Sequence, residues 1–123
     1  MKIPNNLLYT SDHEWILIKD DIAIIGITDF AQGELGDVIF VELPNVGDLV
    51  NKKETVGTIE AVKTVADIFC PLNGTIYEIN TDLEENPEHI NNSPYEKGWI
   101  FKMNNYNKIE NLLSAEEYKK IVQ

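Results

Sequence analysis

The sequence has little of what catalytic, metal-binding or disulfide-stabilised domains need. It contains one cysteine, Cys70, and two histidines, His13 and His89, so an intrachain disulfide is excluded and no zinc-type spacing occurs. The seven glycines are dispersed and form no phosphate-binding loop. No serine stands in a nucleophile-elbow context. These gaps favour a protein that is not itself an enzyme and that holds no metal ion.

Long apolar runs and basic residues are also scarce. No apolar stretch approaches membrane-spanning length, and the first residues contain neither an apolar signal core nor an Arg-rich transit segment. Ten basic residues against 21 acidic ones give a formal net charge of −11, which repels nucleic acid and anionic membrane surfaces. Because a single cysteine also suits a reducing compartment, we expect a bacterial cytoplasmic chain whose partners present basic docking faces.

Short runs rich in β-branched residues, separated by turn signals, occupy most of the chain. A length of 123 residues fits a single domain over 1–123. Strands are predicted at 15–18, 22–27, 38–43, 55–60, 65–69, 75–79 and 99–103. This spacing predicts a mainly β protein, a sandwich or flattened barrel with a few short helices.

Helix signals are confined to a few places. Thr28 is a cap for a short helix over 29–35 that Gly36 ends. The capping box Ser114-Ala115-Glu116-Glu117 predicts a C-terminal helix at about 114–122. Residues 80–98, rich in Asn, Pro and acidic side chains, are expected to form the longest surface loop, with one helical turn before Pro87.

The segment 57–68 is the most specific stretch of the sequence. Two β-rich runs flank a few residues that include a single lysine, Lys63. No Asn-Gly or Asp-Gly pair marks a tight turn, so periodicity alone does not locate the tip. If the chain reverses here, Lys63 projects from a rigid hairpin and offers an amine to a modifying enzyme. From the residues alone, a solvated lysine with no special role is the ordinary interpretation, because most hairpin lysines have none.

Glu60-Ala61-Val62-Lys63 resembles the lipoyl-lysine motif of the glycine cleavage system H protein family. The similarity continues in order along nearly the whole chain, through His13-Glu14-Trp15, 26–32, 35–44, 71–74 and Gly98-Trp99. Each piece is weak alone, and their joint order is specific. The resemblance implies a lipoyl-domain-like β sandwich with lipoic acid bound covalently to Lys63 at a hairpin tip.

The resemblance also implies a task, that of a non-catalytic carrier with several partners. In this family a glycine decarboxylase loads an aminomethyl group onto the lipoyl arm and releases carbon dioxide. A folate-dependent aminomethyltransferase then takes the carbon, and a dihydrolipoyl dehydrogenase reoxidises the dithiol. A lipoate-attaching enzyme is a fourth partner. We expect a monomer, because a mobile arm must visit each of them.

Three acidic residues in the matching segments are candidate companions of the arm. Glu14 and Asp67 are expected to place carboxylates near its protonated amine, and Glu60 and Asp67 to be recognised by the lipoate-attaching enzyme. Solvated acids without such roles fit the same sequence. Many family members carry Ser at position 61 and Ala at 64, and some carry His at position 34, where this chain has Ala, Thr and Glu.

Other functions remain open at this point. Biotin carriers have a similar hairpin, but their lysine usually stands between two methionines, and here Val62 and Thr64 flank it. A relay of lipoyl groups to other complexes is not separable from glycine cleavage by sequence. A free-standing enzyme or a purely structural sandwich is the remaining class.

Overall fold

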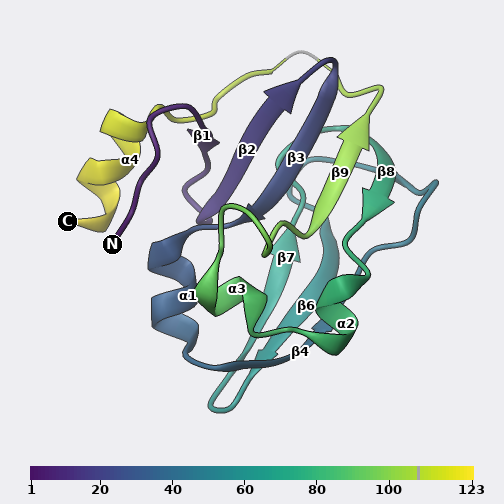
Figure 1. Cartoon of the computed structure of the whole chain (residues 1–123). Coiled ribbons are helices and arrows are strands. Elements are labelled where there is room, and N and C mark those ends of the chain that lie inside the picture. Colours follow the sequence, from purple (N-terminus) through teal and green to yellow (C-terminus); the bar gives the residue numbers. More distant parts are fainter. Residues whose placement is uncertain (108) are drawn as a thin grey trace.

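The computed structural model describes residues 1–107 and 109–123 and folds them into two antiparallel sheets (Figure 1). The larger sheet has the order β1-β2-β3-β9-β8-β5 and the smaller the order β4-β6-β7. The expected mainly β sandwich with few helices is confirmed. The strands are β1 (Leu8–Tyr9), β2 (Glu14–Lys19), β3 (Ile22–Ile27), β4 (Val38–Glu42), β5 (Leu49–Val50), β6 (Thr55–Ala61), β7 (Val65–Phe69), β8 (Gly74–Ile79) and β9 (Phe101–Asn104).

The core lies between the two sheets. Because alternate residues of a strand face opposite sides, each sheet presents an apolar inner face. Ile25 of β3, Ile59 of β6 and Ile68 of β7 are at most 1% exposed and belong to one buried cluster. Full burial of each such side chain stabilises the fold by roughly 1.5–3 kcal/mol. This core fixes the β6–β7 hairpin relative to the larger sheet.

Two helices begin where the sequence predicts. α1 (Asp29–Leu35) is capped by the Thr28 hydroxyl, which accepts a hydrogen bond from the Ala31 amide, and it ends at Gly36, whose φ is +82°. α4 (Ala115–Val122) has the complete capping box at its start. It packs on β1 through Tyr118, whose ring stacks on that of Tyr9 with centroids 4.7 Å apart.

The expected long loop over 80–98 is interrupted by two one-turn helices, α2 (Asp82–Glu85) and α3 (His89–Asn92). The turn before Pro87 was predicted, but α3 was not. Leu83 and Ile90 are fully buried and attach the two turns to the core. A single apolar residue among polar ones produces no periodic signal, so tertiary packing decided this segment. No helix within the described ranges is long and apolar enough to cross a membrane.

Candidate functional site

The β6–β7 hairpin ends in three connecting residues with Lys63 at their centre. Glu60 pairs with Val65 at the last step of the ladder, and the Ala61 amide donates to the Thr64 carbonyl over 2.8 Å. The hairpin projects from the rest of the molecule as a narrow loop at the lower end of Figure 1. Val62, Lys63 and Thr64 are all exposed. The chain therefore reverses at Lys63, the alternative that periodicity alone left open.

Two backbone contacts hold the base of this tip. Ala61 is 4% exposed and pairs with Val38 of β4. The Val62 amide donates to the Asp37 carbonyl over 3.1 Å, which joins the tip to the segment after α1. The Lys63 side chain itself has no hydrogen bond or ion pair within residues 1–107 and 109–123. Its amine is thus presented to solvent from a fixed backbone.

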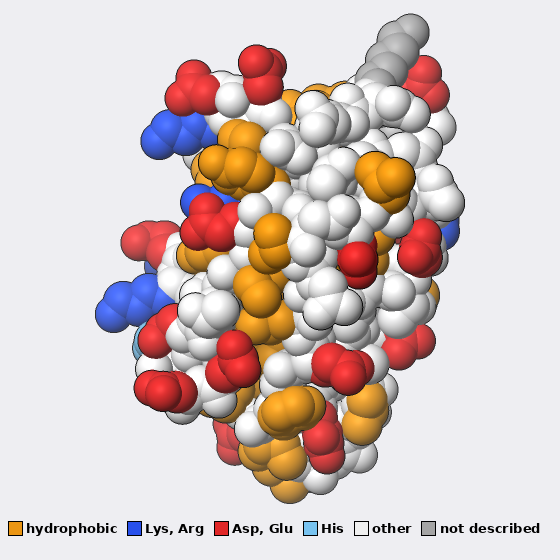
Figure 2. Space-filling model, turned by 90° about the vertical axis from the view of Figure 1, so that its right-hand side faces the viewer, with side chains coloured by type: hydrophobic (Ala, Val, Ile, Leu, Met, Phe, Trp, Pro, Cys, Tyr) orange, Lys and Arg blue, Asp and Glu red, His pale blue; other side chains and the backbone are white. Residues whose placement is uncertain are grey.

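A shallow hollow of about 350 Å³ lies beside the tip. Gly33–Asp37 line one side, and Val62 and Lys63 line the other. Val62 and Val65 are 67% and 61% exposed, so apolar side chains surround the lysine together with acidic ones. Figure 2 shows this mixture of apolar and acidic side chains at the lower end of the molecule. Such a mixed surface is typical of a place where partners dock.

The outer face of the smaller sheet carries two rows of side chains, all exposed except the half-buried Thr58. Residues paired across strands share one face, and the register aligns Phe40, Glu60 and Val65 in the row nearest the tip. The next row consists of Glu42, Thr58 and Asp67. Glu60 and Asp67 are therefore exposed neighbours of Lys63 on the hairpin, with apolar side chains on both sides of Glu60.

Glu14 occupies a different environment, a pocket of about 460 Å³ lined by Thr10, Asp12, Glu14, Lys53 and Cys70 among others. Its side chain is buried, with the residue only 3% exposed, and one carboxylate oxygen accepts a hydrogen bond from the Thr10 hydroxyl over 2.7 Å. Burial raises the pKa of Glu14 to about 7, against the opposing effects of the Thr10 hydrogen bond and the Lys53 charge. This carboxyl therefore changes charge near neutrality.

The turn that carries Glu14 is fixed by the C-terminal helix. His13 takes a left-handed φ of +70°, and the Thr10 amide donates to the Glu14 carbonyl over 3.0 Å. The His13 Nδ1 lies 2.8 Å from the Tyr118 hydroxyl, which lies 2.7 Å from the Thr28 hydroxyl. Burial lowers the pKa of His13. This contact explains how a helix distant in sequence sets the position of the pocket.

The tip and the pocket lie at the two ends of β7, since Cys70 follows that strand directly. A strand advances about 3.3 Å per residue, so Asp67 lies roughly 13 Å from Lys63 along it. An extended lipoyl-lysine measures about 14 Å from its Cα at normal bond lengths. An arm laid along β7 would therefore end near Asp67, whereas Cys70 at the pocket lies three residues further, roughly 23 Å from Lys63 at the same rise.

The structure places the predicted residues in two separate settings. Glu60 and Asp67 lie on the outer face of the hairpin, whereas Glu14 is buried in the pocket that Asp67 does not line. Glu14 is therefore not a solvated acid. A signal for its burial existed, because Glu14 stands two residues before the core residue Ile16 and so shares its face of β2. Sequence reasoning missed Thr10 and Lys53, whose segments carry no recognisable pattern.

Comparisons with known proteins agree with the geometry described above. The family model described as "Glycine cleavage H-protein" matches residues 7–123. The chain belongs to the glycine cleavage H-protein family. Members of this family are lipoyl carriers that shuttle intermediates among the components of the glycine cleavage system.

Individual relatives extend this match over nearly the full length. The chain is similar to the glycine cleavage system H protein of Bacteroides thetaiotaomicron, with 52% identity over 99% of this chain and 98% of the relative. It is 48% identical to that of Halalkalibacterium halodurans, over 98% and 95% of the two chains. A crystal structure of the Mycobacterium marinum H protein superposes with a TM-score of 0.90 at 40% identity, covering 96% of this chain and 97% of the other. The H-protein fold expected from the resemblance is thereby confirmed.

Proposed function

We propose that Lys63 carries a covalent lipoyl group and that the chain acts as a non-catalytic carrier in glycine cleavage. The observation that supports this most is the exposed Lys63 amine, without a side-chain partner in the described ranges, on a tip anchored at Ala61 and Val62. The residues at the tip fit a lipoyl group, because acylation needs an accessible amine and a long arm needs a fixed point of attachment. When bound, the lipoyl group would supply a dithiolane whose disulfide is opened and reduced as it takes the aminomethyl group, and whose dithiol later gives two electrons to the dehydrogenase.

Lys63 contributes attachment and reach rather than chemistry. Acylation turns its ammonium into a neutral amide and removes one positive charge from a tip that already faces Glu34 and Asp37 in the adjoining hollow. Tethering raises the effective concentration of the arm's end at any partner docked on the tip. This arrangement suits a decarboxylase, an aminomethyltransferase and a dihydrolipoyl dehydrogenase that use one arm in turn.

Glu14 and Asp67 serve the far end of the arm in this proposal. Asp67 lies within reach of an extended arm, and the pocket that holds Glu14 begins just beyond the far end of β7. An ionised Glu14 attracts a protonated amine strongly, because burial lowers the local dielectric constant. Enclosure in the pocket also keeps water away from the amine-bearing carbon.

Glu60, together with Asp67, is the proposed recognition feature for the lipoate-attaching enzyme. Glu60 lies one row behind the tip between Phe40 and Val65, which are 51% and 61% exposed. A charge flanked by apolar side chains gives both orientation and contact area to a docking enzyme. The net charge of −11 further favours partners with basic faces, and the curated relatives described above are bacterial, which supports action in a bacterial cytoplasm.

Reconstitution tests this function directly. The lipoylated chain is mixed with a glycine decarboxylase, and the exchange of labelled carbon dioxide into glycine is measured. We expect exchange to depend on the lipoylated chain and to disappear for Lys63→Arg, which keeps the charge but cannot be acylated in the same way. Exchange that persists with Lys63→Arg would contradict the proposal. A lipoylated chain that supports no exchange but donates its lipoyl group to another complex would favour the relay function instead.

A further inference from the structure

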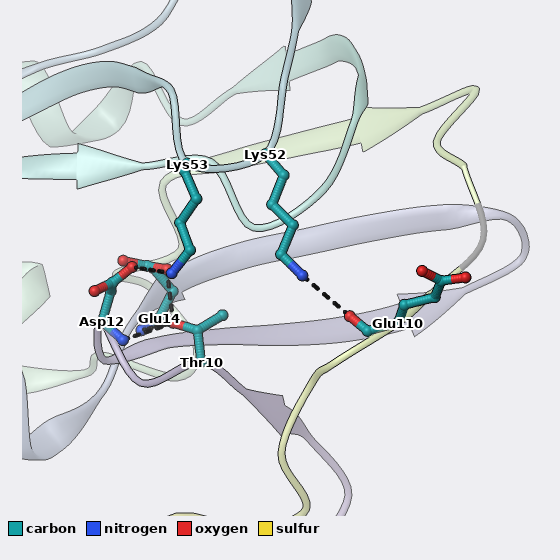
Figure 3. A network of polar contacts seen from close by, with 6 residues as sticks. All are labelled: Thr10, Asp12, Glu14, Lys52, Lys53 and Glu110. Carbon is teal, nitrogen blue, oxygen red and sulfur yellow. Dashed lines mark hydrogen bonds and ion pairs between the residues drawn. The ribbon is translucent and has the colours of Figure 1, made fainter.

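The pocket around Glu14 contains its own cation. Lys53 extends from the segment between β5 and β6, and its Nζ lies 3.0 Å from the Asp12 carboxylate, a contact between residues 41 positions apart. Figure 3 shows the Lys53 side chain pointing toward Asp12 and Glu14 from the opposite side of the pocket. Lys53 also acts electrostatically on Glu14 and lowers its pKa, whereas Asp12 raises it. One ammonium thus faces two carboxyl groups.

The neighbouring lysine, Lys52, has a different partner. Its Nζ donates to the backbone carbonyl of Glu110 over 3.2 Å, and Figure 3 shows it pointing away from Asp12 and Glu14. Among the residues that the structure describes, Lys53 is the one lysine whose ammonium pairs with a carboxylate of the pocket. Lys52 therefore provides a matched control for any effect assigned to Lys53.

The Lys53 contact is built to be reversible. The Lys53 and Asp12 side chains are 62% and 34% exposed, and exposed ion pairs contribute little to stability. The Glu14 carboxyl, by contrast, accepts a hydrogen bond from the Thr10 hydroxyl and makes no ion pair within residues 1–107 and 109–123. A cation that enters the pocket can therefore bind the buried Glu14 carboxyl and compete with the weakly held Lys53 ammonium for Asp12.

The backbone conformation at Lys53 also indicates that its side chain has a role of its own. Its φ is +77°, a left-handed conformation that lysine rarely adopts, and its amide donates to the Cys70 carbonyl over 2.7 Å. Glycine or asparagine would adopt this conformation with less strain. The fold therefore gains nothing in local backbone energy from a lysine here, which leaves the charged side chain as the feature to explain.

We propose that Lys53 is a displaceable counter-ion that holds the cation position of this pocket and yields it to a protonated primary amine. The inference rests on the proposed function, which supplies such an amine at the end of the arm. A neutral arm end does not compete for Asp12 and leaves the Lys53–Asp12 pair closed. A cationic end replaces Lys53 at the carboxylates, so the pocket distinguishes a loaded arm from an empty one and releases the amine without tight binding.

The test uses the full-length chain without a lipoyl group and methylammonium as the probe. Binding is followed by ¹³C NMR of the Asp12 and Glu14 carboxyl carbons, with sodium as the competing ion. Removing the competitor in Lys53→Asn should tighten methylammonium binding about five- to tenfold, because Asp12 then lacks its counter-ion and the Lys53 charge no longer acts on Glu14. Lys53→Arg should bind as weakly as the unaltered chain, and Lys52→Gln should stay within about twofold of it.

Two outcomes overturn this inference. One is Lys53→Asn binding methylammonium no more tightly than the unaltered chain while its thermal unfolding shows an intact fold. The other is the absence of any carboxyl shift with methylammonium in all four proteins. Neither result touches lipoylation of Lys63, since the probe replaces the arm. In the lipoylated chain, Lys53→Asn should in addition lengthen the retention of the amine several-fold without changing the rate of lipoylation.

Discussion

The tip and the pocket, near opposite ends of β7, meet opposite requirements. At the tip, Lys63 is exposed, and the main chain around it is fixed by Ala61 and Val62. At the other end of β7, Glu14 is buried, and a turn held by Tyr118 sets its position. Attachment needs an amine that enzymes can reach, whereas retention of a charged group needs a carboxyl shielded from water. The exposed attachment residue and the buried carboxyl thus lie near opposite ends of β7, Lys63 in the loop before it and Glu14 on β2 beside its far end.

The largest expected contrast between the two regions is in stability. The Glu14 pKa of about 7 exceeds its unfolded value of 4.5, so the folded state binds this proton more tightly. The contribution of this protonated carboxyl to the free energy of unfolding is fully present below pH 4.5 and is lost as the pH rises through 7. Glutamine cannot ionise, so the free energy of unfolding of Glu14→Gln should rise by about 2–3 kcal/mol relative to that of the unaltered chain as the pH is raised from 5 to 8.

Urea unfolding at both pH values measures this gain. Lys63→Gln is the matched control at the tip, and its stability should stay within about 0.5 kcal/mol of the unaltered chain at either pH, because Lys63 is exposed. Equal pH dependence in Glu14→Gln and the unaltered chain would show that Glu14 is solvated after all.

The next effect concerns retention of the amine-bearing arm. Glu14→Ala should shorten the lifetime of that species about tenfold, and Asp67→Ala about twofold, because a buried charge interacts more strongly than an exposed one. The lifetime is measured by the release of formaldehyde and ammonia from the isolated chain. An unchanged lifetime in the double variant would remove both carboxylates from the account, and a larger effect at Asp67 would reverse the comparison.

The smallest effect is expected on the outer face of the hairpin. Glu60→Ala should slow lipoylation two- to fivefold, since one rim charge changes mainly the rate of encounter. Initial rates with a lipoate-attaching enzyme provide the measurement. Thr58→Ala, one row further from the tip on the same strand, is the control and should be lipoylated at the normal rate. Normal lipoylation of Glu60→Ala would remove Glu60 from the recognition surface.

Much of the fold was predictable, because local signals agreed with tertiary packing. The Thr28 cap, the capping box at Ser114 and the long strands all lie where their residues indicate. The two-residue strands β1 and β5 and the turn α3 were missed, since elements this short have no period. Tertiary contacts alone define them.

The candidate site was likewise predictable only in part. The resemblance led to four residues, and the structure adds where each lies: Lys63, Glu14, Glu60 and Asp67. The pocket could not be predicted, because it joins segments around Thr10, Lys53, Cys70 and Asn111 that are remote in sequence. Its ion pair spans 41 residues, and the His13–Tyr118 contact spans 105. No pattern in a single sequence reports contacts at such separations.

The most direct test of the account is peptide mass mapping of the chain after exposure to lipoate and a lipoate-attaching enzyme. The account predicts a lipoyl-sized increment on the peptide that contains Lys63 and on no other lysine peptide. An unmodified Lys63 peptide, a biotin-sized increment on it, or lipoylation spread over other lysines would contradict the claim that this tip presents the attachment amine.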